Sequence, residues 1–188
     1  MFDMNTPLAE IRATVKAVRI YDELERRLVI QFGGRQQVLT EDGKPVVGKD
    51  GDVYETVVKR GWVFSYLEGR KTWPLITIEP FKEETKANGA SRRRENTVHI
   101  RATLKVDMQR DSDPDALLRL ALHHIRIALF DTEEHRQHGG FLLATPQGEK
   151  LLIQSMEEKE PAMFVLPEPG LPLCSVHLTT TLTYTETQ

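Results

Sequence analysis

The sequence predicts an α+β fold built on a largely antiparallel sheet with projecting β-hairpins. The first observation is that residues 97–109 and 173–185 alternate between apolar and polar side chains, which is the period of a strand with one buried face. The second is that residues 114–130 carry apolar side chains at the spacing of an amphipathic helix. The third is a block at residues 33–72 that is rich in turn-forming dipeptides, as is typical of a hairpin insertion.

The length and composition are typical of one ordinary domain. A chain of 188 residues can form a single domain, residues 1–188, with a sizeable core. The formal net charge of -3 offers no overall attraction to nucleic acid. Cys174 is the only cysteine, which excludes an intramolecular disulfide and a four-thiolate zinc site. The sequence shows neither a signal peptide nor an uncharged apolar run of about 18 residues, so we expect a reducing compartment and no membrane partner.

The first helix is predicted to begin at Thr6 and Pro7. The threonine hydroxyl can cap free amide groups, and proline suits the first helical position. Apolar residues then recur at helical spacing, and Gly33 favours an end just before it. The alternative is two short strands, at residues 20–21 and 28–32, that are joined by a turn.

The insertion at residues 33–72 is predicted to contain a projecting hairpin. Residues 53–58 and 62–67 flank a Lys-Arg-Gly turn and have the composition of strands. On the second strand, three aromatic side chains would share one face, namely Trp62, Phe64 and Tyr66. They form either a small local core or a surface that another chain covers.

Two segments of contrasting polarity follow. Residues 73–81, WPLITIEPF, predict a short strand between two prolines that is covered on both faces. Residues 82–96 are polar with a central glycine and are predicted to form a flexible loop. That loop carries Arg92, Arg93 and Arg94, which form either a solvated charge run or a contact to an acidic partner or to nucleic acid.

The second half of the chain contains the clearest helix start. Asp113 is predicted to cap a helix over residues 114–130, which has proline at its first position. Residues 142–144 and 151–156 indicate short strands on either side of a turn. Prolines and a glycine in residues 161–172 indicate an irregular connector.

Two adjacent histidines, His123 and His124, lie in the most apolar stretch of the chain. On a helix, adjacent side chains point about 100° apart, so these rings do not converge on one metal ion. Arg119 and Arg126 occupy the neighbouring positions on the stripe of His123, where a second zinc ligand would be needed. We therefore expect a partly covered polar edge, and neither a metal ligand nor a catalytic base.

Sequence signatures of catalysis are absent. The chain has no phosphate-binding glycine-rich loop, no GxSxG elbow, no HExxH motif and no EF-hand. Cys174 lies on the apolar side of an alternating segment, which favours a buried small residue over a nucleophile. We therefore expect a protein that is not an enzyme, without catalytic residues, a metal site or a cofactor.

Four segments follow one another in the order short strand, long strand, capped helix and closing strand, namely WPLITIEP, NTVHIRATLKVDMQ, DPDALLRLALHHIRIALFD and VHLTTTLTYTE. Together they resemble the tail terminator proteins of long-tailed bacteriophages, which are also called tail completion or minor tail proteins. The resemblance spans residues 73–131 and 173–186. The block at residues 33–72 and the proline-rich connector are long for that family.

The resemblance implies a mixed sheet with helices packed on one face and a structural virion protein without catalytic residues. Family members form rings, commonly hexameric, that stop growth of the tail tube and present a surface to the head connector. The implied partners are further copies of this chain, the tail tube protein, a sheath protein where one exists, and the neck or head connector protein. Non-specific contact with DNA passing through the ring is implied as well. The implied location is the tail or neck of a virion that is assembled in the host cytoplasm.

Two other functions stay open at this stage. Another phage neck or head-completion ring protein would use the same kind of small α+β subunit. An enzyme or ligand-binding protein with an unfamiliar pocket would instead bring polar side chains together around a deep cavity. For an assembly, the candidate contact residues are Trp62, Phe64, Tyr66, Arg92, Arg93 and Arg94.

Overall fold

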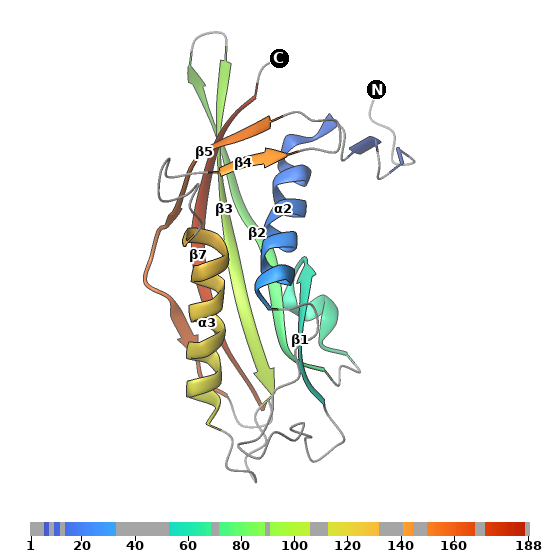
Figure 1. The fold of residues 1–188 in the computed structure, drawn as a ribbon, viewed down its shortest axis with the longest axis vertical. Helices are drawn as coiled ribbons and strands as arrows, with labels where there is room; N and C mark the ends of the chain where they lie inside the picture. Colours follow the sequence, from blue (N-terminus) through green and yellow to red (C-terminus); the bar gives the residue numbers. More distant parts are fainter. Residues whose placement is uncertain are drawn as a thin grey trace.

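Three long strands form the centre of the structure, and two α-helices cover one face of their sheet (Figure 1). The computed structural model describes residues 6–7, 10–11, 14–32, 53–68, 72–88, 91–105, 113–131, 141–144, 150–167 and 172–186. The helices are α2 (Lys16–Gln31), the short 3-10 helix η1 (Val63–Tyr66) and α3 (Pro114–Phe130). The strands are β1 (Val53–Arg60), β2 (Thr72–Asn88), β3 (Ser91–Lys105), β4 (Phe141–Ala144), β5 (Lys150–Glu158), β6 (Met163–Val165) and β7 (Leu173–Glu186).

The described strands form one seven-stranded mixed sheet in the order β1-β2-β3-β7-β5-β4, with β6 also paired to β7. β1 and β2 run parallel, and the other described pairs are antiparallel. β5 and β6 pair with successive parts of the same edge of β7. The predicted α+β class and the largely antiparallel sheet are therefore confirmed.

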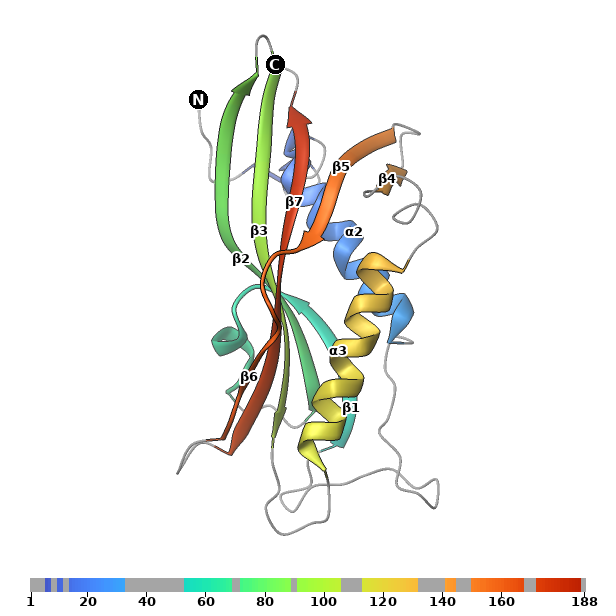
Figure 2. The same ribbon diagram turned by 90° about the vertical axis from the view of Figure 1, so that its left-hand side faces the viewer.

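Both α-helices pack on the same face of this sheet. α2 contacts β1 and β2, α3 contacts β3, β7 and β5, and the two helices contact each other. Figure 2 shows the layers from the side, with both α-helices to one side of the long strands and η1 to the other. The face opposite the α-helices is called the outer face below, and the helix-covered face is called the inner face.

α2 confirms the predicted first helix over most of its length. Its buried side chains Ile20, Leu24 and Leu28 recur every four residues and point into the core. The alternative of two strands in this segment is wrong. The single helix from Thr6 is interrupted, because Val15 is extended with φ -97 and ψ 103, directly before α2 begins.

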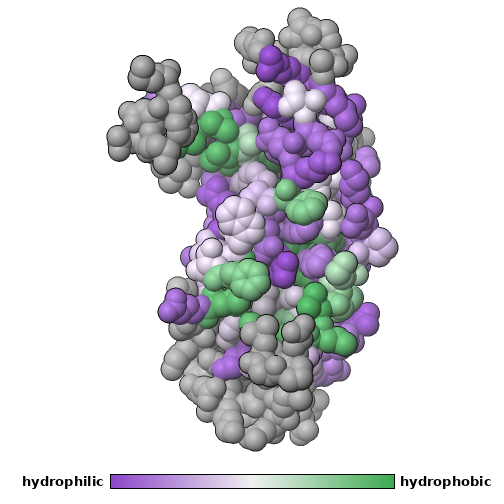
Figure 3. Space-filling view, turned by 180° about the vertical axis from the view of Figure 1, so that it is seen from behind, coloured by the Kyte–Doolittle hydropathy of each residue, from purple (hydrophilic) through white to green (hydrophobic). Residues whose placement is uncertain are grey.

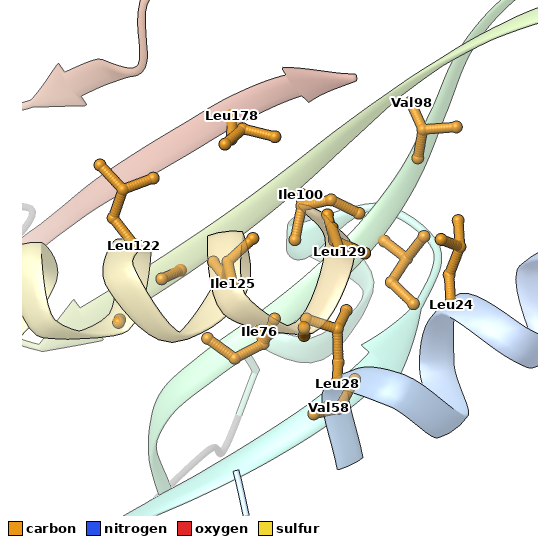
Figure 4. Packing of buried hydrophobic residues seen from close by; sticks show 14 of the residues in the cluster. Leu24, Leu28, Val58, Ile76, Val98, Ile100, Leu122, Ile125, Leu129 and Leu178 are labelled. Carbon is orange, nitrogen blue, oxygen red and sulfur yellow. The ribbon is translucent and has the colours of Figure 1, made fainter. Parts of the chain in front are cut away.

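α3 begins where the cap predicts. The carboxylate of Asp113 accepts a hydrogen bond from the backbone N–H of Ala116 at 3.0 Å, and Pro114 follows at the first position. Below this turn, the buried side chains of α3 face those of α2 and of the sheet. Figure 4 shows this layer, which includes Leu24, Leu28, Val58, Ile76, Val98, Ile100, Leu122, Ile125, Leu129 and Leu178.

Replacing Asp113 with alanine should lower the free energy of unfolding by about 1 kcal/mol, because one helix N–H loses its acceptor. The measurement is chemical denaturation of the variant beside the native chain. Asp113→Asn is the matched control, since its side-chain oxygen can still accept the hydrogen bond and should retain most of the stability. Equal losses for both variants would count against the capping role.

The hairpin predicted between residues 53 and 67 is wrong. β1 pairs with β2 in parallel, and residues 63–66 form η1 instead of a returning strand. Gly61 has a φ of 107, and its N–H donates to the carbonyl of Ile78 at 3.0 Å, so the chain leaves β1 toward β2. Residues 33–52 and 69–71 of the predicted insertion lie outside the described residues.

The flexible loop predicted at residues 82–96 is also wrong. β2 continues to Asn88 and β3 begins at Ser91, so these polar residues form an antiparallel pair. β7 pairs with the other edge of β3 along the same stretch, which satisfies the backbone on both sides. We call residues 82–88 and 91–96 the β2–β3 arm. Its far end extends past the helix-covered part of the sheet (Figure 1).

The remaining strands agree in part with those predicted from the sequence. The buried segment of β2 is covered on both faces, as Leu75, Ile76 and Ile78 show with 0% exposure. β4, β5 and β7 confirm the predicted strands around residues 142–156 and 173–185. The connector predicted as irregular contains β6, and residues 106–109 of the predicted long strand lie outside the described part.

Candidate interaction surface

The outer face carries several exposed apolar side chains although the core is on the other side of the sheet. Figure 3 shows this face, on which apolar side chains lie between hydrophilic ones. We define the apolar rim as five exposed apolar residues. They are Trp62 directly before η1, Phe64 in η1, Phe81 in β2, and Met163 and Val165 in β6. Aromatic and methionine side chains are enriched in protein interfaces, so the rim is a candidate contact surface.

The three aromatic residues that were predicted to share one strand face lie in different environments. Trp62 is 60% exposed and Phe64 is 79% exposed, so both agree with a surface that another chain can cover. Tyr66 is half-buried and packs against the core, and its hydroxyl donates to the carbonyl of Arg60. The two alternatives for this cluster therefore apply to different members of it.

η1 is attached to the outer face by a buried carboxylate. Glu79 of β2 is 5% exposed, and its Oε1 accepts the N–H of Val63 at 3.1 Å and the hydroxyl of Thr77 at 2.8 Å. The Nε of Arg101 on β3 lies 3.4 Å from the same oxygen. Glu79 thus positions the segment that presents Trp62 and Phe64. Sequence reasoning missed it, although a carboxylate inside an otherwise apolar strand was a usable signal.

Glu79→Gln should lower the free energy of unfolding by about 1–3 kcal/mol, because Arg101 loses the charge it faces and a buried charge-assisted network is broken. Urea denaturation measures the loss. Glu84→Gln on the same strand is the control, because Glu84 pairs with the exposed Lys82 and should change stability little. If the two variants were equally stable, Glu79 would not be the anchor of η1.

Three rings form a stack across the outer face. The ring centroids of Phe81 and His99 are 4.4 Å apart at an interplanar angle of 21°, and those of His99 and His177 are 5.5 Å apart at 9°. Burial lowers the pKa of His99 below its ordinary value, an effect that the Glu79 carboxylate opposes and Arg101 reinforces. Burial also lowers the pKa of His177, and Arg101 and His99 reinforce that shift.

In the described part of the structure, short outward side chains of the central strands are shielded by neighbouring side chains and not by an α-helix. Thr97 on β3 lies between Lys82 and Thr181, and Thr181 lies between Thr97 and Glu157. Both threonines are 9% exposed, because longer side chains on the neighbouring strands flank them. The predicted polar face of the last strand is therefore present but largely inaccessible, and the rim and the arm offer the more accessible contacts.

The three arginines of the arm do not form one cationic patch. Arg92 and Arg93 are exposed and, as neighbours on a strand, point to opposite faces. Arg94 is half-buried and lies 3.3 Å from a carboxylate oxygen of Glu83. On the outer face of the arm, Glu95 pairs with Lys86 at 3.0 Å. Both signs of charge therefore alternate along the arm.

The adjacent histidines occupy two different environments. His123 is exposed, whereas His124 is half-buried, with its Nδ1 2.9 Å from the side-chain nitrogen of Gln31 and its ring against Phe32. Arg126 forms a two-point contact with Glu158 of β5, which holds the polar stripe of α3 to that strand. His124 thus packs against the end of α2, in agreement with a covered polar edge.

The described residues hold no group of three or more histidine, cysteine or acidic side chains that could bind a metal ion. Cys174 is buried, and burial raises the pKa of its thiol to about 11, so little thiolate forms at neutral pH. Among the described helices, none has the length and hydropathy required to cross a bilayer.

No protein-family model matches the chain, and no curated protein matches it significantly.

Proposed function

We propose that this chain is a structural subunit of a tailed bacteriophage, of the tail terminator type, which closes into a ring at the end of the tail tube. The observation that carries the proposal is the order of the elements. A helix, a short parallel strand, a long antiparallel strand pair, a capped helix and a long closing strand follow one another. Both α-helices lie on one face of the sheet, as the resemblance to tail terminators implies.

The apolar rim supports a subunit that assembles. A ring repeats one contact between two different surfaces of neighbouring subunits until the rotation closes. Phe81 is 65% exposed and Met163 is 55% exposed, and on the outer face Phe81 stacks on His99 while Met163 lies opposite His177. Exposed apolar groups of this kind lower their free energy when another protein surface covers them. We assign the contact between copies to this face.

The arm supports a contact to a second kind of partner. Arg92 and Arg93 lie near the tip of β3, beyond the helix layer, and are accessible from outside. In a ring, the copies of each arginine would repeat at one radius, and those on one face of the arm could meet an acidic face of the tail tube or neck protein. We favour a protein partner over DNA, because the net charge of the chain is -3 and no aromatic residues interleave with the arginines for base stacking.

The proposal is tested by locating the chain in phage particles whose genome encodes it. Antibody labelling seen by electron microscopy should mark the head-proximal end of the tail. Particles that lack the chain should have tails of irregular length that do not join heads. Label at the portal, with normal tails in its absence, would favour a head-completion ring protein. Particles with no label would overturn the proposal.

A further inference from the structure

The Phe81–His99–His177 stack has a property that goes beyond assembly and does not depend on it. Its rings come from β2, β3 and β7, so the strand pairing alone brings them together. The two imidazoles are nearly parallel, at 9°, with their centroids 5.5 Å apart. Neutral rings gain from such stacking, whereas two imidazolium ions at this separation repel each other.

The hydrogen bonding around the stack does not stabilise a second positive charge. Nδ1 of His177 is buried and has no hydrogen-bond partner among the described residues. A proton placed on that nitrogen would become a buried charged donor without an acceptor, which is a costly state. The ring must therefore turn before it can be fully protonated and hydrogen-bonded.

The surrounding charges come from β2, from β3 and from the connection between β5 and β6. Arg101 lies directly opposite His177 across the β3–β7 pair and adds a permanent positive charge. The Glu79 carboxylate on β2 is engaged by Val63, Thr77 and Arg101, so it is not free to turn toward the imidazoles.

Lys82 and Lys159 are each paired with a glutamate, at Glu84 and Glu95 respectively. Glu160, between β5 and β6, is exposed and attracts the protonated form of both histidines.

We propose that the Phe81–His99–His177 stack is an acid-sensitive switch on the outer face, closed while at most one imidazole is charged and opened when the second takes up a proton. The charged ring of His177 turns from His99 and Arg101 toward Glu160. β6 is the strand that moves when the ring turns, because it has three residues and pairs only with β7 among the described strands. Met163 lies opposite His177 on that strand, so acid reshapes part of the apolar rim.

The test is an NMR titration of the imidazole and Phe81 ring signals in the full chain, from about pH 8 to about pH 4 around the ordinary histidine pKa of about 6.5. The native chain should show two separate steps for His99 and His177, because coupled sites release protons one after the other. The Phe81 and His99 ring signals should lose their stacking shifts at the more acidic step only.

His177→Phe is the decisive variant, because it keeps a stacked ring but removes the second charge. His99 should then titrate in a single step at higher pH than the second step of the native chain, and the ring shifts should persist in acid. His177→Gln serves if the phenylalanine variant does not fold. His123→Gln is the control, since that exposed residue on α3 should leave both steps unchanged.

Stability provides an independent readout with a defined sign. The pKa values of both histidines are lowered by folding, so the unfolded chain binds protons first as the pH falls. The contribution of these two histidines to the free energy of unfolding should therefore be constant above the ordinary histidine pKa and fall below it until the folded values are passed. His177→Phe should reduce this slope. Uncoupled titration of the two native histidines, or ring shifts that survive the second step, would overturn the switch.

Discussion

Leu129→Ala should lower the free energy of unfolding by about 2–5 kcal/mol, which is a large part of the stability of an ordinary domain. The side chain of Leu129 is 0% exposed and lies on α3 between the sheet and α2 (Figure 4). Removing three carbons there leaves a cavity that the packed helices can fill only in part. Urea denaturation followed by circular dichroism measures the loss. An unchanged slope of the free energy of unfolding against urea concentration would show that the same fold unfolds.

Leu120→Ala is the matched control for this prediction, because it makes the same change on the same helix. Leu120 is 52% exposed, so its removal should change stability by less than about 0.5 kcal/mol. The difference between the variants then isolates burial from helix propensity, which is equal in both. Similar losses in both variants would mean that α3 does not pack on the sheet as described.

The double substitution Trp62→Ala and Phe64→Ala should leave the monomer folded and weaken self-association about 30-fold or more. Such a loss corresponds to about 2 kcal/mol, the size expected when a central aromatic contact of an interface is removed. Both side chains are mostly exposed, so their loss should cost the isolated subunit little stability. Analytical ultracentrifugation over a range of concentrations measures the association, and thermal unfolding measures the stability.

The control for the association experiment is Ile30→Ala with Leu120→Ala. These side chains are also more than half exposed, but they lie on α2 and α3, away from the outer face. Association of this variant should equal that of the native chain. A stronger effect here than at Trp62 and Phe64 would move the subunit contact from the outer face to the helix layer.

Local patterns in the sequence were sufficient for the elements whose stability depends on one buried face. The cap at Asp113 and the apolar spacing that follows it predicted α3 with the bounds that the structure has. The alternation over residues 173–185 likewise predicted β7, because the core requires every second side chain of that strand. For the candidate site, the sequence left open whether Trp62 and Phe64 are buried in a local core or accessible, and it predicted a strand where the structure has η1.

Only the tertiary structure decided the rest, because backbone hydrogen bonds join segments that are distant in sequence. The polar arm is a strand pair since β7 offers a second partner to β3, and composition alone carries no sign of that pairing. Phe81, His99 and His177 lie on three strands, and each is an ordinary residue in its own segment. Their stacking depends on the register between β2, β3 and β7, which a shift of one residue would abolish by turning a ring to the other face.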